Sequence, residues 1–263
     1  VLVAGRFTPR AGKRHEGELR ARVTELIDRI AAKGRAEVVE DLAAPLPAMV
    51  INDWLGFPRD AWPRSQHWAA VTMLAGGQHD ERTGEMDLFG VEGASAAFED
   101  FTRAVLELIP ERRRAPQDDL LSVWVHADID GRKLRDDEVV SEALLVLNGG
   151  AETTRTAIAH ALVLFCEHPE HWEALARHPE RIPRAVEEIL RYVTPLNNMF
   201  RRATREAEVE GVTIRPHDRL VLLYASANRD TRHFADADRF DPSRSPNPHI
   251  AFGFGTHFRV GAA

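Results

Sequence analysis

A chain of 263 residues with 44% apolar residues is long enough to bury one large hydrophobic core or two smaller ones. Its 41 acidic residues outnumber its 34 basic residues, and the net charge of -7 argues against nucleic acid or an anionic membrane as a partner. Cys166 is the single cysteine, which excludes an internal disulfide and is typical of a reducing cytoplasm. No stretch approaches the roughly 18 to 20 apolar residues of a membrane span, and no signal peptide is recognised, so we expect a cytoplasmic protein.

The first half of the sequence has mainly helical periodicity. Four segments are expected to be helices: residues 11–33, 38–57, 61–74 and 93–109. The second of these contains Pro45 and Pro47, which predict an irregular start. Two polar or charged segments are expected to be connections, the first of them a mobile loop: residues 76–90 and 112–119.

The most periodic segment begins at Asp136, which is suited to cap a helix, and ends before Pro169. Its roughly 30 residues would make a helix about 45 Å long at 1.5 Å per residue. Because apolar residues occupy most of its faces, we expect this helix to run through the middle of the fold.

The remaining third of the sequence adds a small β component. A helix is predicted from Pro183 to Pro195, with one buried stripe made of Val186, Ile189, Leu190 and Val193. Two strands and an ordered coil are expected to follow: residues 208–214, 219–225 and 228–249. The predicted fold is therefore mainly α with a small β component, in a single domain over residues 1–263.

A polar segment with two glycines, Gly149 to Thr154, interrupts the long helix. Each glycine costs about 1 kcal/mol relative to alanine in a helix, so the pair predicts that another group approaches the backbone. Glu152 is unusual in an apolar helix, and an adjacent threonine can bond a carbonyl one turn back. A close helix crossing with a solvated Glu152 explains the segment equally well, so the residues alone leave a structural and a functional interpretation open.

Two further pairs of residues are candidates for a site. Glu188 and Arg191 are three apart on one helical face and can form an ion pair. Arg201 and Arg202 precede a predicted strand, where an arginine pair is usually solvated. Neither pair alone predicts a function.

A histidine-rich segment follows the long helix. Pro169 breaks its local spacing, and no cysteine or carboxylate set completes a metal site. Structural or surface roles are therefore expected for its histidines: His160, His168, His171 and His178. Cys166 is expected to be a small core residue.

Residues 252–261 read Phe-Gly-Phe-Gly-Thr-His-Phe-Arg-Val-Gly. Glycines in such a loop let the backbone approach a large, flat group. The loop resembles the haem-binding loop of the cytochrome P-450 family, Phe-Gly-x-Gly-x-His-x-Cys-x-Gly. The segment Gly149 to Thr154 is similar to the family pattern Gly-Gly/Ala-x-Glu/Asp-Thr-Thr, and Glu188-x-x-Arg191 and Arg201-x-Ala-Thr follow in the family's order.

The resemblance implies a cytochrome P-450 fold with haem b as cofactor. The fold would be incomplete at both ends, because the chain opens on Val1 and stops at Ala263 soon after the loop. Residues implied to contact the cofactor are Gly149, Gly150, Arg201, Phe252, Gly253, His257 and Gly261. Among these, Arg201 and His257 would hold the propionates, since a guanidinium matches a carboxylate in a fork geometry.

The resemblance also implies roles away from the cofactor's edge. Glu152 and Thr153 would be the catalytic pair that routes protons over the distal face. A structural triad would be formed by Glu188, Arg191 and Arg239. The substrate pocket would be lined by Ala151, Leu196, Asn197 and Met199.

The implied function is that of a soluble bacterial monooxygenase, which inserts one atom of O2 into a C–H bond of a small apolar substrate. Electrons would come from a ferredoxin-type donor, and neither nucleic acid nor a membrane is expected as a partner. Three short segments further resemble enzymes that oxidise sterol side chains and other lipids: residues 197–201, 222–230 and 246–249.

Arg259 departs from the family pattern at its most important position. The family has there the cysteine whose thiolate binds the iron, whereas arginine stays protonated and offers no lone pair. Two explanations remain open. The chain is a monooxygenase impaired by a recent change or a sequence error, which the retained Glu152, Thr153, Arg201 and His257 favour. Alternatively, it is a haem-free P-450-like scaffold that activates a partner glycosyltransferase.

Overall fold

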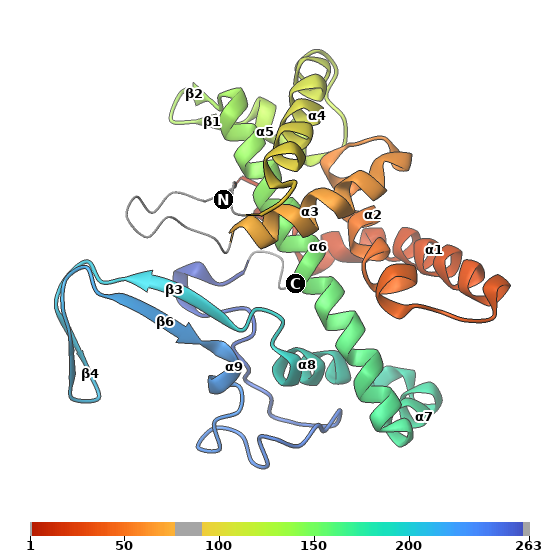
Figure 1. Ribbon diagram of the computed structural model, residues 1–263, viewed down its shortest axis with the longest axis vertical. Helices are drawn as coiled ribbons and strands as arrows, with labels where there is room; N and C mark the ends of the chain where they lie inside the picture. Colours follow the sequence, from red (N-terminus) through yellow and green to blue (C-terminus); the bar gives the residue numbers. More distant parts are fainter. Residues whose placement is uncertain (1, 77–90, 260–263) are drawn as a thin grey trace. The chain divides into compact units, whose positions relative to one another are not determined.

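The computed structural model describes residues 2–76 and 91–259, and the chain divides into two compact units (Figure 1). The first unit extends to Thr156 and the second begins at Ala157. The boundary falls inside one continuous helix, α6 (Asp136–Glu167). Each unit is described below by itself, and the assembly of both into a single domain stays a prediction.

The first unit is helical, as predicted. Its helices before α6 are α1 (Pro9–Lys33), α2 (Pro45–Leu55), α3 (Trp62–Gly76), α4 (Ala94–Arg114) and α5 (Leu120–His126). The irregular start predicted for the second helix is confirmed, because a π-helical turn, Val39–Ala43, precedes α2. A short hairpin of β1 (Asp128–Ile129) and β2 (Arg132–Lys133) leads into α6. The predicted loop at residues 76–90 lies almost wholly outside the described residues.

Two aromatic residues anchor the core of the first unit. Trp68 and Trp124 have no exposed surface, and Phe101 contacts Trp68 edge-on with ring centroids 5.5 Å apart. The core-facing stripe of α6 consists of residues spaced four apart: Val139, Ala143, Leu147 and Ala151. The expectation that α6 is buried on most faces is wrong for Leu145, which is 68% exposed.

A buried ion pair joins α2, α4 and α5. Arg112 donates from Nε to Asp119 Oδ2 over 2.5 Å and from Nη2 to the carbonyl of Gly56 over 2.8 Å. The other oxygen of Asp119 accepts from the amide of Ser122 and caps α5. The connector predicted at residues 112–119 is therefore shorter than expected, because α4 continues to Arg114, and it ends at Asp119, the buried cap residue of α5. Charge alone does not distinguish a solvated run from a pair that satisfies itself in the interior.

The second unit combines the end of α6 with two helices and small sheets. Its further elements are α7 (Pro169–Arg177), α8 (Ile182–Val193), β3 (Asn198–Arg202), β4 (Ala207–Val209), β5 (Val212–Ile214), β6 (Arg219–Leu223) and α9 (Tyr224–Ala227). Its hydrophobic centre is formed by Leu164, Ile189 and Phe240. Of the predicted stripe on α8, Val186 is 44% exposed, and Cys166 is also exposed, so both burial predictions are wrong.

The β component differs from the prediction in its pairing. The single strand expected at residues 208–214 is a hairpin, in which β4 and β5 turn at Glu210 and Gly211 with φ of 48° and 80°. β6 pairs antiparallel with β3, which the sequence analysis missed, and Arg201 lies opposite Leu220. β6 also ends at Leu223 rather than at residue 225, because α9 begins at Tyr224.

The ordered coil predicted at residues 228–249 is confirmed, since this fully described segment contains neither helix nor strand. In the part of the chain that the structure describes, every helix is too short or too polar to cross a bilayer.

Candidate functional site

The glycine-bearing segment of α6 lies in the first unit and keeps its helical form. Thr153 Oγ1 donates to the carbonyl of Gly149 over 2.9 Å, which is the bond to the previous turn expected from the sequence. A Cβ added at Gly150 would lie 2.4 Å from Cδ1 of Ile51 on α2. A close approach by α2 is therefore a sufficient reason for glycine at this position, and the proposed cofactor contact of Gly150 stays a prediction.

Glu152 is half-buried and forms an ion pair with Arg155 one turn along α6. Its Oε2 lies 2.5 Å from Arg155 Nη2, and the two side chains are 15% and 36% exposed. Glu152 is thus not freely solvated, contrary to the structural interpretation of this segment. Arg155 was missed by the sequence analysis, although its i,i+3 spacing could have indicated it.

The residues predicted to line a substrate pocket fall in both units. Ala151 is buried in the core of the first unit. In the second unit Leu196 is half-buried, whereas Asn197 and Met199 are exposed. Their common role in a pocket stays a prediction.

A buried carboxylate organises the second unit. Glu188 has no exposed surface, and Arg191 donates to both of its oxygens, from Nε and Nη2, over 2.8 Å each. The amide of Asp241 donates to Oε1 over 2.9 Å, and Asn247 Nδ2 donates to Oε2 over 3.2 Å. A buried charge needs such partners, and here the coil after α9 supplies them.

The third member of this cluster is Arg244 and not Arg239. Arg244 Nε lies 3.1 and 3.2 Å from the two oxygens of Glu188, whereas Arg239 is exposed and contributes its carbonyl, which accepts from Arg191 and Arg244. The prediction of Arg239 is corrected on this point. The two arginines are five residues apart in an aperiodic coil, so the sequence offered no geometric basis for choosing between them.

Backbone carbonyls satisfy the remaining donors of the two arginines. Arg191 Nη1 donates to the carbonyls of Asn228 and Ala237, and Arg244 Nη1 donates to that of Ala235. Asn228 also accepts from the amide of Ile250 over 2.8 Å. The coil is thereby attached to α8, and Ile250, two residues before the glycine loop, is bonded back to Asn228 at the start of the coil.

The glycine loop is a closed turn. Gly253 and Gly255 have φ of 77° and 73°, which side chains rarely adopt, and a Cβ on Gly253 would lie 3.3 Å from the hydroxyl of Tyr224. The amide of Phe258 donates to the carbonyl of Gly255, and that of Arg259 donates to the carbonyl of Phe252, each over 3.0 Å. Residue 259 is thus held opposite residue 252 by the backbone.

The side chains of the loop are mostly exposed. Phe254 is 86% exposed, His257 is exposed, and Phe252 is half-buried. Arg201, which is predicted to act with His257, is half-buried on β3 and donates to the carbonyl of Phe200. Gly261 lies outside the described residues. Contacts of these residues with a cofactor stay predictions.

Arg259 does not fit a haem-thiolate site. Its side chain is half-buried, and burial lowers the pKa of its guanidinium below the ordinary value. Even so, a guanidinium has five N–H donors and no acceptor lone pair for a metal. The backbone of the loop suits the approach of a flat group, whereas the donor set at residue 259 does not suit its iron.

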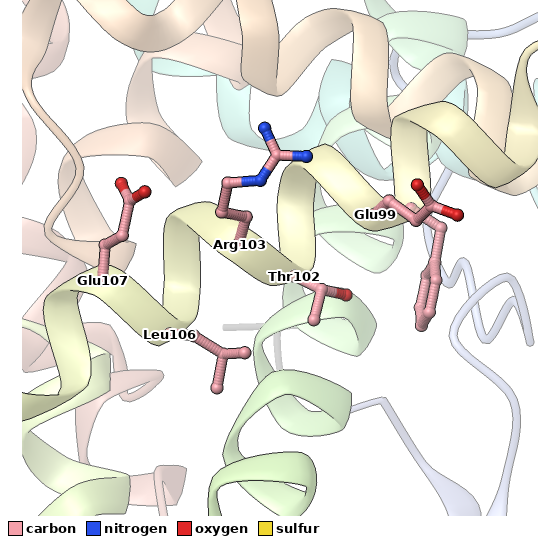
Figure 2. A pocket seen from close by; sticks show the side chains of 6 residues that line it. Glu99, Thr102, Arg103, Leu106 and Glu107 are labelled. Atoms are coloured by element: carbon pink, nitrogen blue, oxygen red, sulfur yellow. The ribbon is translucent and has the colours of Figure 1, made fainter.

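A shallow hollow of ≈ 470 Å³ lies elsewhere, on the surface of α4. Among the residues that the structure describes, those that line it come from this one helix (Figure 2): Phe98, Glu99, Thr102, Arg103, Leu106 and Glu107. It includes none of the predicted site residues.

Sequence comparisons place these features in a known context. The profile of the family described as Cytochrome P450 matches residues 90–263. A Steroid C26-monooxygenase of Mycobacterium tuberculosis (strain CDC 1551 / Oshkosh) is 40% identical over 262 residues, which are 99% of this chain and 68% of that protein. Another Steroid C26-monooxygenase, from Mycolicibacterium smegmatis, is 38% identical, and the match covers 90% of this chain and 57% of that protein. The chain thus spans about two thirds or less of the length of these relatives.

Solved structures agree with the sequence comparisons. The cytochrome P450 PksS of Bacillus subtilis 168 is 33% identical and superimposes with a TM-score of 0.87 over 99% of this chain and 65% of that one. CYP109E1 of Bacillus megaterium, solved in complex with testosterone, is 31% identical with a TM-score of 0.86, over 99% of this chain and 69% of that one. The predicted P-450 fold is therefore confirmed, and the chain belongs to the cytochrome P450 family, whose named relatives include monooxygenases.

Proposed function

We propose that this chain is the larger part of a haem-dependent monooxygenase whose activity is impaired by Arg259. In its unimpaired form the enzyme inserts one atom of O2 into a C–H bond of a small apolar substrate and takes electrons from a ferredoxin-type donor. The observation that supports this proposal is the loop at residues 252–259. Its closing bonds are present, and the coil that leads to it is attached to α8 at Glu188, although the residue at position 259 cannot bind iron.

The residues that would support the reaction are present apart from the iron ligand. Glu152, oriented by Arg155, and Thr153 are proposed to handle protons, and Arg201 and His257 to hold the propionates. The loss of one side chain from an otherwise complete set favours impairment over an early loss of the cofactor. A chain without a cofactor would be under no constraint to keep these residues.

The substitution Arg259→Cys in the full-length protein tests the proposal. We expect purified protein to contain about one haem per chain and to show the carbon monoxide difference band of a thiolate-bound haem, since the introduced sulfur supplies the missing ligand. Haem content and the difference spectrum are the measurements.

Arg259→Ser is the matched control, because it removes the guanidinium without supplying a soft donor. Both variants should also be made with Cys166→Ser, because the exposed thiol of Cys166 can itself bind haem iron and imitate a ligand at residue 259. If Arg259→Cys, folded by circular dichroism, gains no more haem and no more of the band than Arg259→Ser, the proposal is wrong.

The second candidate function is a haem-free scaffold that activates a partner glycosyltransferase. The half-buried, protonated residue at position 259 favours it, since a guanidinium opposes binding of the iron. This function predicts that the unmodified full-length protein is purified without haem and increases the rate of such a transferase. Arg259→Cys would leave that stimulation unchanged, which distinguishes the two functions.

A sterol-like or lipid-like substrate is proposed on the basis of the relatives. The relative that is 40% identical is named for oxidation of steroids at C26, and one solved neighbour holds testosterone. A biotin biosynthesis cytochrome P450 of Bacillus subtilis (strain 168) is 34% identical, and this lower identity makes the steroid-oxidising relative the better guide to the substrate class.

A further inference from the structure

Two histidines and a glutamate gather at the start of α7. His168 is the N-cap residue, Pro169 occupies the first helical turn, and the amide of His171 donates to the carbonyl of His168 over 3.0 Å. The sequence analysis expected Pro169 to break the spacing of the histidines. That expectation is wrong, because Pro169 begins the helix that brings them together. The sequence analysis found no carboxylate for this cluster, whereas the structure supplies that of Glu170.

The donor atoms have the separations of a metal site. One ligand atom from each of His168, Glu170 and His171 lies within 4.8 Å of the others. Glu170 Oε1 lies 3.5 Å from His168 Nδ1 and 3.9 Å from His171 Nε2. Both distances are long for hydrogen bonds. They are close to the separation of about 3.4 Å between neighbouring ligands of a tetrahedral ion with bonds of about 2.0–2.1 Å.

The two imidazoles are held in place by an aromatic cluster. Phe240 is buried, and its ring centroid lies 6.1 Å from that of His168 and 5.7 Å from that of His171. The histidine side chains keep 42% and 26% of their surface exposed, so an ion can reach their nitrogen atoms. A site whose rings are already oriented loses less entropy when it binds.

The same tripeptide occurs again ten residues later at a helical start. His178, Pro179 and Glu180 repeat the sequence of His168, Pro169 and Glu170, and the backbone angles of the two histidines agree within 3° (φ, ψ of -129°, 66° and -132°, 68°). His178 Nδ1 lies 3.2 Å from Glu180 Oε1. The fourth residue differs, because the position that corresponds to His171 is Arg181, a cation with no lone pair.

We propose that His168, Glu170 and His171 bind a divalent transition metal of the Zn²⁺ class, with water completing the coordination. Two imidazoles and one carboxylate are a donor set that suits Zn²⁺ and its neighbours better than Ca²⁺ or Mg²⁺. Because all three ligands lie at the N-cap and in the first turn of α7, the ion would fix the start of this helix, directly after the end of α6. This site is independent of residue 259 and of any haem.

Zn²⁺ titration of the full-length protein, freed of metals with a chelator, tests the proposal by calorimetry. We expect one binding event that is absent, or at least tenfold weaker, in His171→Arg and in Glu170→Gln. His171→Arg recreates the sequence found at residues 178–181, so it is compatible with this helical start. Circular dichroism confirms that each variant is folded.

Arg181→His is the reciprocal variant, which completes the donor set at the second tripeptide. We expect it to add a second, weaker binding event, since among the described residues no aromatic ring contacts His178 as Phe240 contacts His168. Undiminished binding by His171→Arg would overturn the proposal. So would the absence of a second event in Arg181→His, because the three donors at this spacing would then not suffice.

Discussion

At the scale of single residues, the attachment of the coil to α8 depends on Glu188. This carboxylate is fully buried and accepts from Arg191, Arg244, Asn247 and the backbone of Asp241. Since two guanidinium groups share one carboxylate, carbonyls of the coil must accept their remaining N–H donors. The cluster therefore fixes the course of the chain toward the glycine loop without contacting the loop's own side chains.

The assignment of Arg244 gives a direct mutational prediction. Arg244→Ala should lower the free energy of unfolding of the second unit by about 3 kcal/mol, because it removes one partner of a buried ion pair. Arg239→Ala should change it by less than about 0.5 kcal/mol, since that side chain is exposed. Urea unfolding followed by circular dichroism measures both, and equal losses in the two variants would contradict the assignment.

At the scale of elements, α6 is positioned by its first turn and by a contact near its middle. Glu138 accepts from the amide of Arg135 over 2.8 Å and from Arg132 over 2.7 and 3.0 Å, which links the β1–β2 hairpin to the start of the helix. Gly150 then allows α2 to approach through Ile51. Both contacts lie in the first unit.

The first-turn contact predicts a dependence of stability on pH. Hydrogen bonds from Arg132 and from the amide of Arg135 lower the pKa of Glu138 from 4.5 to about 2. Because this pKa is lowered in the folded state, the stability that Glu138 contributes is fully present above about pH 5 and is lost as the pH falls toward 2.

The difference in free energy of unfolding between the unmodified protein and Glu138→Gln should therefore shrink across this acidic window. Urea unfolding followed by the fluorescence of the buried Trp68 and Trp124 measures it. Glu142→Gln, at an exposed position on the next turn, is the control. A difference that stays constant with pH would exclude this contribution.

The contact at Gly150 predicts a coupled pair of mutations. Gly150→Ala gains at most about 1 kcal/mol of helix propensity, but its Cβ displaces the buried Ile51 at a cost of about 1–3 kcal/mol, so a net loss of stability is expected. In Ile51→Ala, which lacks both Cδ1 and Cγ1, the same change should be neutral or stabilising. A double-mutant cycle by urea unfolding measures the coupling, and additive effects would show that the contact does not require glycine.

At the scale of the whole molecule, the family is established by the order of motifs along the chain and by the fold that carries them. The net charge of -7 disfavours nucleic acid as a partner. The proposed site residues are distributed over both units, with Glu152 and Thr153 in the first and Arg201 and His257 in the second. The proposed activity therefore requires residues of both units.

The proposed substrate class gives a prediction at this scale. Full-length Arg259→Cys protein, once loaded with haem, should change its haem absorption on titration with a sterol, because an apolar ligand displaces water from the pocket. The half-saturating sterol concentration should be at least tenfold lower than that of a small polar alcohol used as the control. An absorption change that shows no preference for the sterol would count against this substrate class.

The sequence by itself determined the longer helices, the extent of α6 and the identity of the glycine loop, whereas it missed the shorter helices α5, α7 and α9. These depend on local signals, such as the acidic first turn that begins at Asp136 and the proline that follows the helix, which act over a few residues. The tertiary structure decided which arginine reaches Glu188, that β3 pairs with β6, and that Glu170 lies between two histidines. Each of these depends on where the chain returns after a turn or a long separation. The sequence also offers more than one residue of suitable chemistry, such as Arg239 and Arg244 as partners of Glu188. Burial was decided in the same way, since Cys166 and Leu145 are apolar by type and yet exposed where their helix places them.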